Sequence, residues 1–285
     1  MTEIIRPQIA DVNWDKYMRS PRAVWELVDR LQDSKLDPQY QGLILEILLA
    51  PELEELKFSH NLRAGKKGNL LPQAANLNWK TIGSSVSLAA QIIRDNSISL
   101  AGRSDKVAQG ARVYYSVIIA NIFPSLSEVE REGLFNHFRV DEVVYDSTRE
   151  RSRDPLAIFY QNSDIPLKWK VELSARVHKK IVAQSAKPRT WSERLTKVSL
   201  AERYSGLLRN IEFGHERQRD LHHFFVSEVE FLLRNSALSP VFTRQDELEQ
   251  VLDDLKTSAL NQEKLFILHF RTHGFRVNTA GNRWT

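Results

Sequence analysis

Cysteine is absent from this chain of 285 residues. Its absence excludes disulfide bonds, thiolate catalysis and any structural zinc site that depends on cysteine ligands, and it is typical of a reducing compartment. Long apolar runs are also missing, because GLILEILLA and YYSVIIANIF fall far short of the roughly 18 residues that span a bilayer. The first residues, MTEIIRPQIADVNWDK, lack the basic and apolar parts of a signal peptide. We therefore expect a soluble, cytoplasmic protein that makes no membrane contact.

Glycine is scarce, with 11 residues, and none of the common glycine-containing site motifs occurs. The sequence has no G-x-x-x-x-G-K-[ST], G-x-G-x-x-G, G-x-S-x-G or H-E-x-x-H, and so shows no phosphate-binding loop, nucleophile elbow or zinc-protease helix. Glu55-x-Lys57 with Asp37 upstream loosely resembles the PD-(D/E)xK nuclease pattern, but that pattern needs a strand and this stretch has helical character. His269 and His273 lie four residues apart with no carboxylate at the catalytic position between them. We expect neither a metal nor a cofactor.

Helical periodicity runs along almost the whole chain. In one middle segment an apolar residue recurs at every fourth position, at Ile165, Trp169, Leu173, Val177 and Ile181. Helices are predicted over about 20–32, 37–50, 51–58, 79–95, 104–122, 125–138, 165–184, 192–212, 217–234, 243–256 and 261–273. Strand alternation is scarce, and its best candidates are residues 140–146 and 275–279. The sequence therefore predicts an all-α fold, a multi-helix bundle in one or two lobes with few or no strands.

Local signals place some helix ends and one boundary between lobes. Residues 125–128, SLSE, match a capping box that would start a helix running to Phe138. Asp164 is the expected cap of the helix that follows it. Residues 60–77 are expected to form a loop, because glycine, proline and asparagine break the pattern there. The charged stretch at 146–155 marks a change in composition, which predicts an N-terminal helical lobe (1–147) and a C-terminal basic helical lobe (148–285).

Positive charge is concentrated in one part of the chain. The net charge is only +4, yet Arg149–Asp220 holds 16 basic and nine acidic residues, a net charge of +7. The remainder of the chain is therefore slightly acidic. Such asymmetry indicates a polyanionic partner, most often nucleic acid, although a solvated lysine-rich surface explains it equally well. We call Arg149–Asp220 the basic segment.

Arginine and lysine neutralise phosphates, and an exposed tryptophan can stack on a base. Trp169 lies on the apolar helix face and is expected in the core, whereas Trp191 is the better candidate for exposure. The candidate nucleic-acid contacts are Arg63, Lys66 and Lys67 in the predicted loop, and Arg149, Arg151, Arg153, Lys168, Lys170, Arg176, Lys179, Lys180, Lys187, Arg189 and Trp191 in the basic segment. These residues predict contacts mainly to phosphate, with RNA and DNA both open.

A second candidate site lies near the end of the basic segment, in the stretch RNIEFGH. Arg209, Asn210 and His215 spell R-N-x4-H, with LLRN expected to end one helix and FGH to begin the next. This motif resembles the signature of the HEPN superfamily, helical ribonucleases and nucleotide-binding domains of prokaryotic defence and toxin systems. The resemblance implies a metal-independent composite site across a dimer. There the histidine would move a proton of the ribose 2′-hydroxyl, and the arginine would stabilise charge on the phosphate. The alternative is a purely structural role, as a polar junction between helices.

Three functional interpretations remain open from the sequence. The first is a non-enzymatic protein that binds nucleic acid or serves as a subunit of a nucleoprotein complex. The second is a HEPN-like ribonuclease acting through Arg209 and His215. The third is a helical adaptor that meets other proteins through its helix faces.

Overall fold

The computed structural model describes residues 21–31, 36–51, 79, 85–140, 154–185, 200–208, 211–214, 216–235, 253 and 278–279. Helices make up about three quarters of this part of the chain, and its strands are two segments of two residues each. The all-α prediction is therefore confirmed. The chain divides into two compact units, Met1–Pro155 and Leu156–Thr285. The predicted boundary, between residues 147 and 148, lies eight residues before this division.

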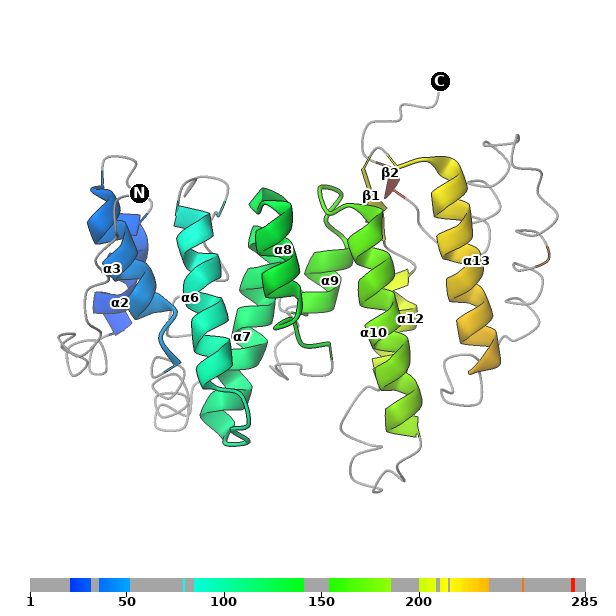
Figure 1. Ribbon diagram of the computed structural model, residues 1–285, viewed down its shortest axis with the longest axis horizontal. Helices are drawn as coiled ribbons and strands as arrows, with labels where there is room; N and C mark the ends of the chain where they lie inside the picture. Colours follow the sequence, from blue (N-terminus) through cyan, green and yellow to red (C-terminus); the bar gives the residue numbers. More distant parts are fainter. Residues whose placement is uncertain are drawn as a thin grey trace. The chain divides into compact units, whose positions relative to one another are not determined.

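Unit 1 contains helices α2 (Pro21–Leu31) and α3 (Pro38–Leu48), which pack against each other (Figure 1). Each starts with proline, whose fixed φ suits the first turn and whose missing N–H leaves no helical bond unmade. Asp37 caps α3, because its side chain accepts a hydrogen bond from the Gln39 N–H at 2.8 Å. α2 buries an apolar face at Leu27, Val28 and Leu31. Proline and aspartate thus fix where these two helices begin.

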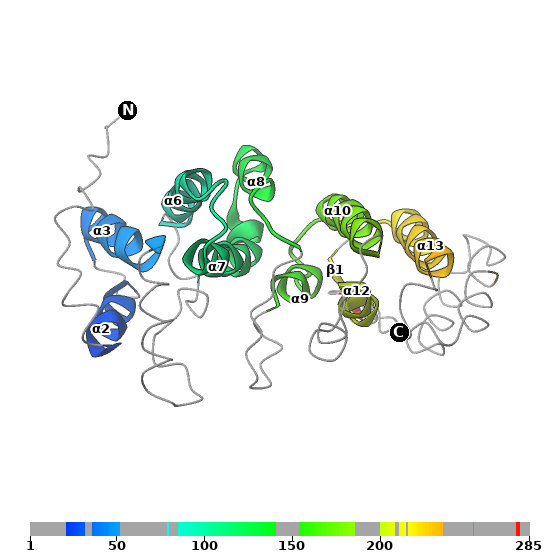
Figure 2. The same cartoon turned by 90° about the horizontal axis from the view of Figure 1, so that it is seen from below.

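Three further helices complete the described part of unit 1: α6 (Ser85–Ser99), α7 (Lys106–Ile122) and α8 (Glu128–Phe135). α6 packs against α3, α7 and α8, as Figures 1 and 2 show. Gly102, in the turn after α6, has a φ of 83°, in the left-handed region that favours glycine. Asp105 caps α7, so this helix begins two residues later than predicted. α6 is therefore the helix around which this unit is packed.

The capping box of α8 lies two residues later than the sequence analysis placed it. Ser127 and Glu130 form it: Ser127 N–H donates to the Glu130 carboxylate at 2.8 Å, and the Glu130 N–H donates to Ser127 Oγ. Ser125 instead closes a short 3-10 turn at Phe123–Ser125. The stretch SLSEVE matches the capping pattern in both registers, and the 3-10 turn occupies the first of them. The helix also ends three residues earlier than predicted.

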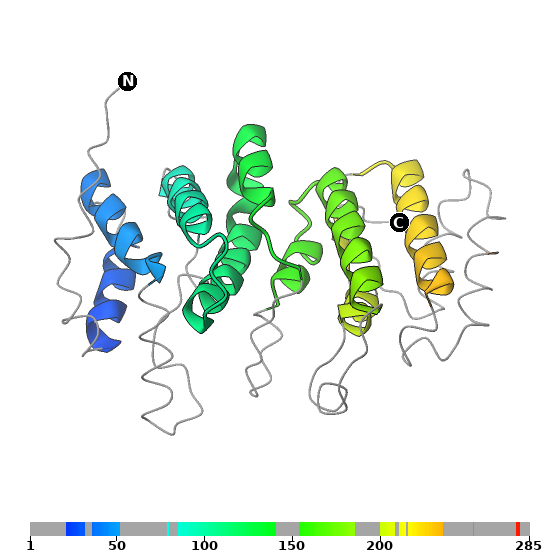
Figure 3. The same ribbon diagram turned by 60° about the horizontal axis from the view of Figure 1, so that its bottom comes forward.

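The described elements that reach into unit 2 are helices and two short strands: α9 (Pro155–Tyr160), α10 (Leu167–Ser185), α12 (Leu200–Leu208), β1 (Glu212–Phe213), α13 (Gln218–Arg234) and β2 (Asn278–Thr279). α10 packs against both α12 and α13 (Figures 1 and 3). β1 and β2 pair in parallel. A strand was predicted at 275–279, and its last two residues form β2. The other strand candidate, 140–146, lies outside the described residues from position 141 onward.

The start of α10 does not use the predicted cap. The helix begins at Leu167, and the Leu167 N–H donates to the Glu216 carboxylate at 2.7 Å. Asp164 lies in the preceding turn, where its own N–H donates to the Asn162 side chain at 2.9 Å. A carboxylate suits the positive end of a helix, and here a distant residue supplies it instead of a local one. The prediction for Asp164 was therefore wrong.

Candidate nucleic-acid interface

The inner face of α10 matches the apolar pattern of the sequence. Trp169, Leu173, Val177 and Ile181 are all buried, and Ile165 is buried just before the helix. α12 and α13 cover this face. The core assignment of Trp169 is confirmed. With one side of α10 fixed against the unit, its opposite side faces solvent.

Three of the predicted nucleic-acid contacts lie exposed on this helix, at Lys168, Lys179 and Lys180. We call them the α10 lysines. Lys168 and Lys179 are eleven residues apart, which is close to three helical turns, so they point the same way about 16 Å apart along the axis. The Lys168 Nζ also lies 5.2 Å from the centre of the Trp169 ring, where the ring face attracts a cation. The structure thus aligns two cations on one face of a rigid helix.

Arg176 is less available than the α10 lysines. It is half-buried, and burial lowers the pKa of its guanidinium while the Glu172 charge opposes that shift. Glu172 is exposed on the same side of the helix as Lys168 and Lys179. An acid between two cations reduces the positive potential that a phosphate would meet. The face is therefore basic at its two ends and weaker in the middle.

Lys170 must be removed from the predicted contacts, because its side chain is completely buried. Its Nζ donates to two main-chain carbonyls, those of Asn162 and Glu212, and lies 5.0 Å from the centre of the Phe213 ring. Burial lowers the pKa of Lys170 to about 8, although the charges of three nearby acids, Glu216 first among them, oppose the shift. A lysine in this position holds the chain together and cannot reach a phosphate.

The R-N-x4-H segment lies between α12 and α13, and Arg209, Asn210 and His215 themselves lie outside the described residues. The residues between them pass through β1, with Ile211 and Phe213 fully buried. FGH was expected to begin the next helix, and this is wrong: α13 begins only at Gln218. The strand β1 therefore connects the Arg209–Asn210 part of the motif to His215.

Main-chain contacts anchor this strand to the turn before α10. Lys170 binds the Glu212 carbonyl, and the Glu216 carboxylate caps α10. A Cβ added at Gly214 would lie 2.7 Å from the carbonyl oxygen of Ser163, so only glycine permits this approach. The residues on both sides of His215 in the sequence thus contact one turn, at residues 162–167.

The remaining predicted contacts lie outside the described residues. They are Arg63, Lys66, Lys67, Arg149, Arg151, Arg153, Lys187, Arg189 and Trp191. Among the predicted contacts that the structure describes, the exposed lysines are the α10 lysines.

A buried polar network was not predicted at all. It joins one hydroxyl or carboxylate from each of four helices, with a histidine at its edge: Tyr160 (α9), Ser174 and His178 (α10), Tyr204 (α12) and Glu228 (α13). The Tyr204 hydroxyl lies 2.5 Å from Glu228 Oε2 and 2.6 Å from Ser174 Oγ. It has one proton, which goes to the carboxylate, so Ser174 donates to Tyr204 and Tyr160 donates to Ser174. A chain of hydrogen bonds therefore ends on Glu228.

The surroundings of Glu228 keep this network in one protonation pattern. His178 Nε2 lies 2.7 Å from Glu228 Oε2, and the His178 ring stacks on Phe231 with 3.6 Å between ring centres. Burial first, and the Glu228 charge second, raise the pKa of Tyr160 and of Tyr204, so both hydroxyls remain protonated donors. The only sequence signal was a polar pair at helical spacing, Ser174 and His178, inside an apolar face. The network ties four helices together on the buried side of α10.

Among the described residues, no three histidine, aspartate or glutamate side chains are grouped so as to hold a metal ion. Within the same part of the chain, no helix combines the length and the apolar character needed to cross a membrane.

Comparisons of the chain with protein-family models, with curated proteins and with solved structures find no match.

Proposed function

We propose that this protein binds nucleic acid through the α10 lysines and the basic segment that contains them. The observation that carries the proposal is the exposed pair Lys168 and Lys179 on one face of a helix, within a segment of net charge +7. Their separation along the helix is about 16 Å. An unpaired strand, whose phosphates are not held on a fixed helical path, can meet both cations along a positively charged surface.

Such contacts are directed at phosphates and carry little sequence information. Each neutralised phosphate releases counterions, so affinity falls steeply as salt rises. Glu172, between the two lysines, repels the same phosphates, and its replacement by glutamine is expected to strengthen binding. We therefore infer that the interaction is salt-sensitive and only weakly sequence-specific. Removal of the Glu172 charge should strengthen it, whereas removal of a lysine charge should weaken it.

The test is a titration of labelled single-stranded RNA, single-stranded DNA and duplex DNA at about 50 mM and about 200 mM salt. The double variant Lys168→Glu/Lys179→Glu should weaken binding and reduce the slope of log affinity against log salt by about 2. Arg30→Glu/Arg139→Glu is the matched control, since it changes the net charge equally at exposed arginines of unit 1. Equal binding by the two double variants would contradict the proposal. Absence of binding at low salt, with co-purification of a protein, would favour the adaptor.

A metal-independent ribonuclease is the second candidate function. What favours it is the anchoring of the R-N-x4-H segment: Gly214 and Glu216, which flank His215 in the sequence, are both held against the turn before α10. A simple polar junction between helices needs neither the glycine approach nor the long-range cap. Arg209 and His215 would supply the positive charge and the proton transfer that ribose-phosphate cleavage requires.

RNA incubated with the protein in excess EDTA tests this candidate, with products sized on a denaturing gel. The expected result is shortening by the unaltered protein and none by His215→Ala or Arg209→Ala. If the variants cleave as well as the unaltered protein, the activity belongs to a contaminant and this candidate fails. The binding proposal does not depend on that outcome, because its variants lie on α10.

A further inference from the structure

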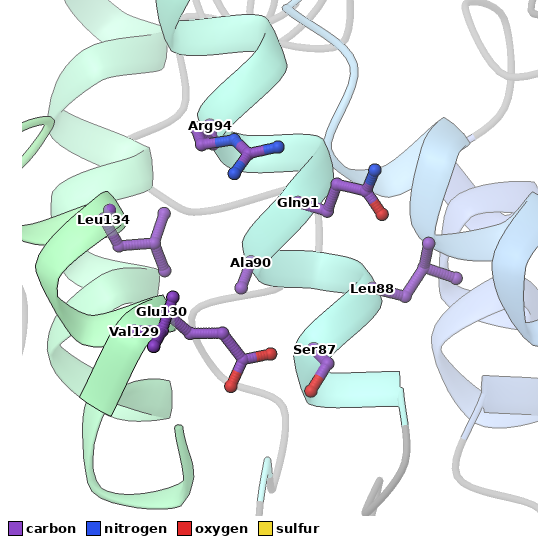
Figure 4. A pocket seen from close by; sticks show the side chains of 9 residues that line it. Ser87, Leu88, Ala90, Gln91, Arg94, Val129, Glu130 and Leu134 are labelled. Atoms are coloured by element: carbon purple, nitrogen blue, oxygen red, sulfur yellow. The ribbon is translucent and has the colours of Figure 1, made fainter. Parts of the chain in front are cut away.

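A groove in unit 1 lies between α6 and α8. Its volume is about 380 Å3. α6 contributes one helix face to it, with Ser87, Leu88, Ala90, Gln91 and Arg94, and α8 contributes Val129, Glu130, Gly133 and Leu134 (Figure 4). Ala90 and Leu134 are buried and form an apolar floor. We call this feature the α6–α8 groove.

One residue of the groove is unfavourable for the stability of its own helix. Gly133 lies inside helix α8, where glycine is less favourable than alanine. A Cβ added there would meet no atom within 4 Å, so packing does not require glycine. A local cost without a local structural reason is a mark of a functional position. The missing side chain of Gly133 leaves open space beside Val129, whose apolar side chain on the rim is 79% exposed.

The groove is also electrically polarised. Arg94 stands at one end with its side chain half exposed and a 3.6 Å contact to Asp95. Arg139 and Arg94 both act on His137, whose pKa is lowered by burial first and by these two charges next, so positive charge gathers near this end. At the other end Glu130 is held by Ser127, and hydrogen bonds from Ser127 and Ser87 lower its pKa. One end of the groove therefore attracts anions and the other repels them.

We propose that the α6–α8 groove binds a free small molecule that has an anionic head and an apolar body. The head, a carboxylate, sulfonate or phosphate, would lie at Arg94, and the body would cover Ala90, Leu134 and Val129. The volume lies within the range of small-molecule sites, which are apolar with a few polar groups that orient the ligand. The charge at Arg94 sets the orientation, because Glu130 disfavours an anion at the opposite end. The residues that line it are not among the candidate nucleic-acid contacts.

The experiment uses the full chain and the fluorophore anilinonaphthalene sulfonate, which carries an anionic sulfonate on an aromatic body. We expect saturable binding with enhanced fluorescence. Gly133→Leu fills the groove from a position with open space around its Cβ, so it should abolish this binding and leave the melting temperature equal or higher. Arg94→Gln should weaken binding about tenfold or more, the loss of one charge-assisted hydrogen bond.

Matched controls separate the groove from unspecific adsorption. Ile98 is 59% exposed on α6 but does not line the groove, so Ile98→Thr should leave binding unchanged while Val129→Thr weakens it. Arg30→Gln is the control for the charge. The proposal is overturned if the protein does not bind the fluorophore, or if the groove variants bind it as well as their controls. Co-sedimentation with anionic phospholipid vesicles that Arg94→Gln abolishes would also overturn it, because the ligand would then be a membrane surface.

Discussion

Replacement of Lys170 by methionine gives the sharpest test of the packing in unit 2. Lys170 is completely buried, and its Nζ donates to the Asn162 and Glu212 carbonyls. Methionine has a similar length and no charge, but it leaves both carbonyls without this donor. At neutral pH the relief of a buried charge and the loss of two hydrogen bonds oppose each other, each worth a few kcal/mol. The stability change at a single pH is therefore uninformative, whereas its pH dependence has a definite sign.

The sign follows from the depressed pKa of Lys170. Its folded-state value is about 8, against 10.5 for an ordinary lysine. Between these two values the unfolded chain binds more protons than the folded one, so this lysine makes the free energy of unfolding rise with pH. The pKa difference between the folded and the unfolded chain corresponds to about 3 kcal/mol in the free energy of unfolding. Of this free energy, about 2.5 kcal/mol is regained as the pH rises from about 7 to about 10. Below about pH 7 the destabilisation is complete and constant.

Urea denaturation of the full chain at about pH 7 and about pH 10 measures this effect. The informative quantity is the difference in the free energy of unfolding between the original protein and Lys170→Met at each pH. Tyr160 and Tyr204, whose pKa values burial raises, destabilise the fold at high pH equally in both proteins and therefore cancel. Between the two pH values, we expect the free energy of unfolding of the original protein to rise by about 2.5 kcal/mol more than that of the variant.

Lys179→Met is the matched control, since it removes an exposed lysine from the same helix. The comparison of Lys170→Met with Lys179→Met separates the effect of the buried position from the loss of a lysine as such. If the curves of Lys170→Met and of the original protein run parallel from about pH 7 to about pH 10, then Lys170 keeps an ordinary pKa. The inference that a desolvated Lys170 anchors the R-N-x4-H segment would then be wrong.

Three further predictions follow from single contacts. Gly214→Ala should destabilise the protein by about 2 kcal/mol or more in urea denaturation, because its Cβ would lie 2.7 Å from the Ser163 carbonyl oxygen; an unchanged midpoint would mean that the two segments do not meet. Ser127→Ala should lower the free energy of unfolding by about 1 kcal/mol, because it removes the α8 cap, and Ser125→Ala should lower it much less. The reverse order in thermal melts would mean that Ser125 is the cap. Tyr204→Phe should cost about 1–3 kcal/mol, since it removes a donor from a buried carboxylate, and a neutral result would show that the network is not closed as described.

Sequence patterns located the helices well where the signal is local. The aspartate and proline that start α3 are adjacent in the chain, and a cap acts on N–H groups two or three residues away. The apolar face of α10 was equally predictable, because helical spacing alone decides which side chains share a face. The capping box of α8 shows the limit of such signals. Two overlapping matches were equivalent by pattern, and only the preceding 3-10 turn distinguishes them.

The candidate site was less predictable, because its decisive contacts join distant parts of the chain. The pattern placed Lys170 among other lysines, yet its partner Glu212 lies 42 residues away. Glu216 caps α10 from 49 residues away, which no local signal at Asp164 could reveal. Glu228 and His178 are 50 residues apart. In each case helical spacing gives the direction of a side chain but not the group that it meets.

A count of charged residues along a sequence therefore supports a function only after the buried charges have been separated from the exposed ones. Lys170 adds to the net charge of the basic segment, but its charge is directed at two carbonyls and is screened from solvent by the protein around it. Lys168 and Lys179 contribute less to the fold and more to the field outside it, because they are exposed. A phosphate approaching α10 responds to that outer field alone. The same helix thus uses lysine in two opposite ways, one to fix the chain beneath the R-N-x4-H segment and the other to attract a polyanion.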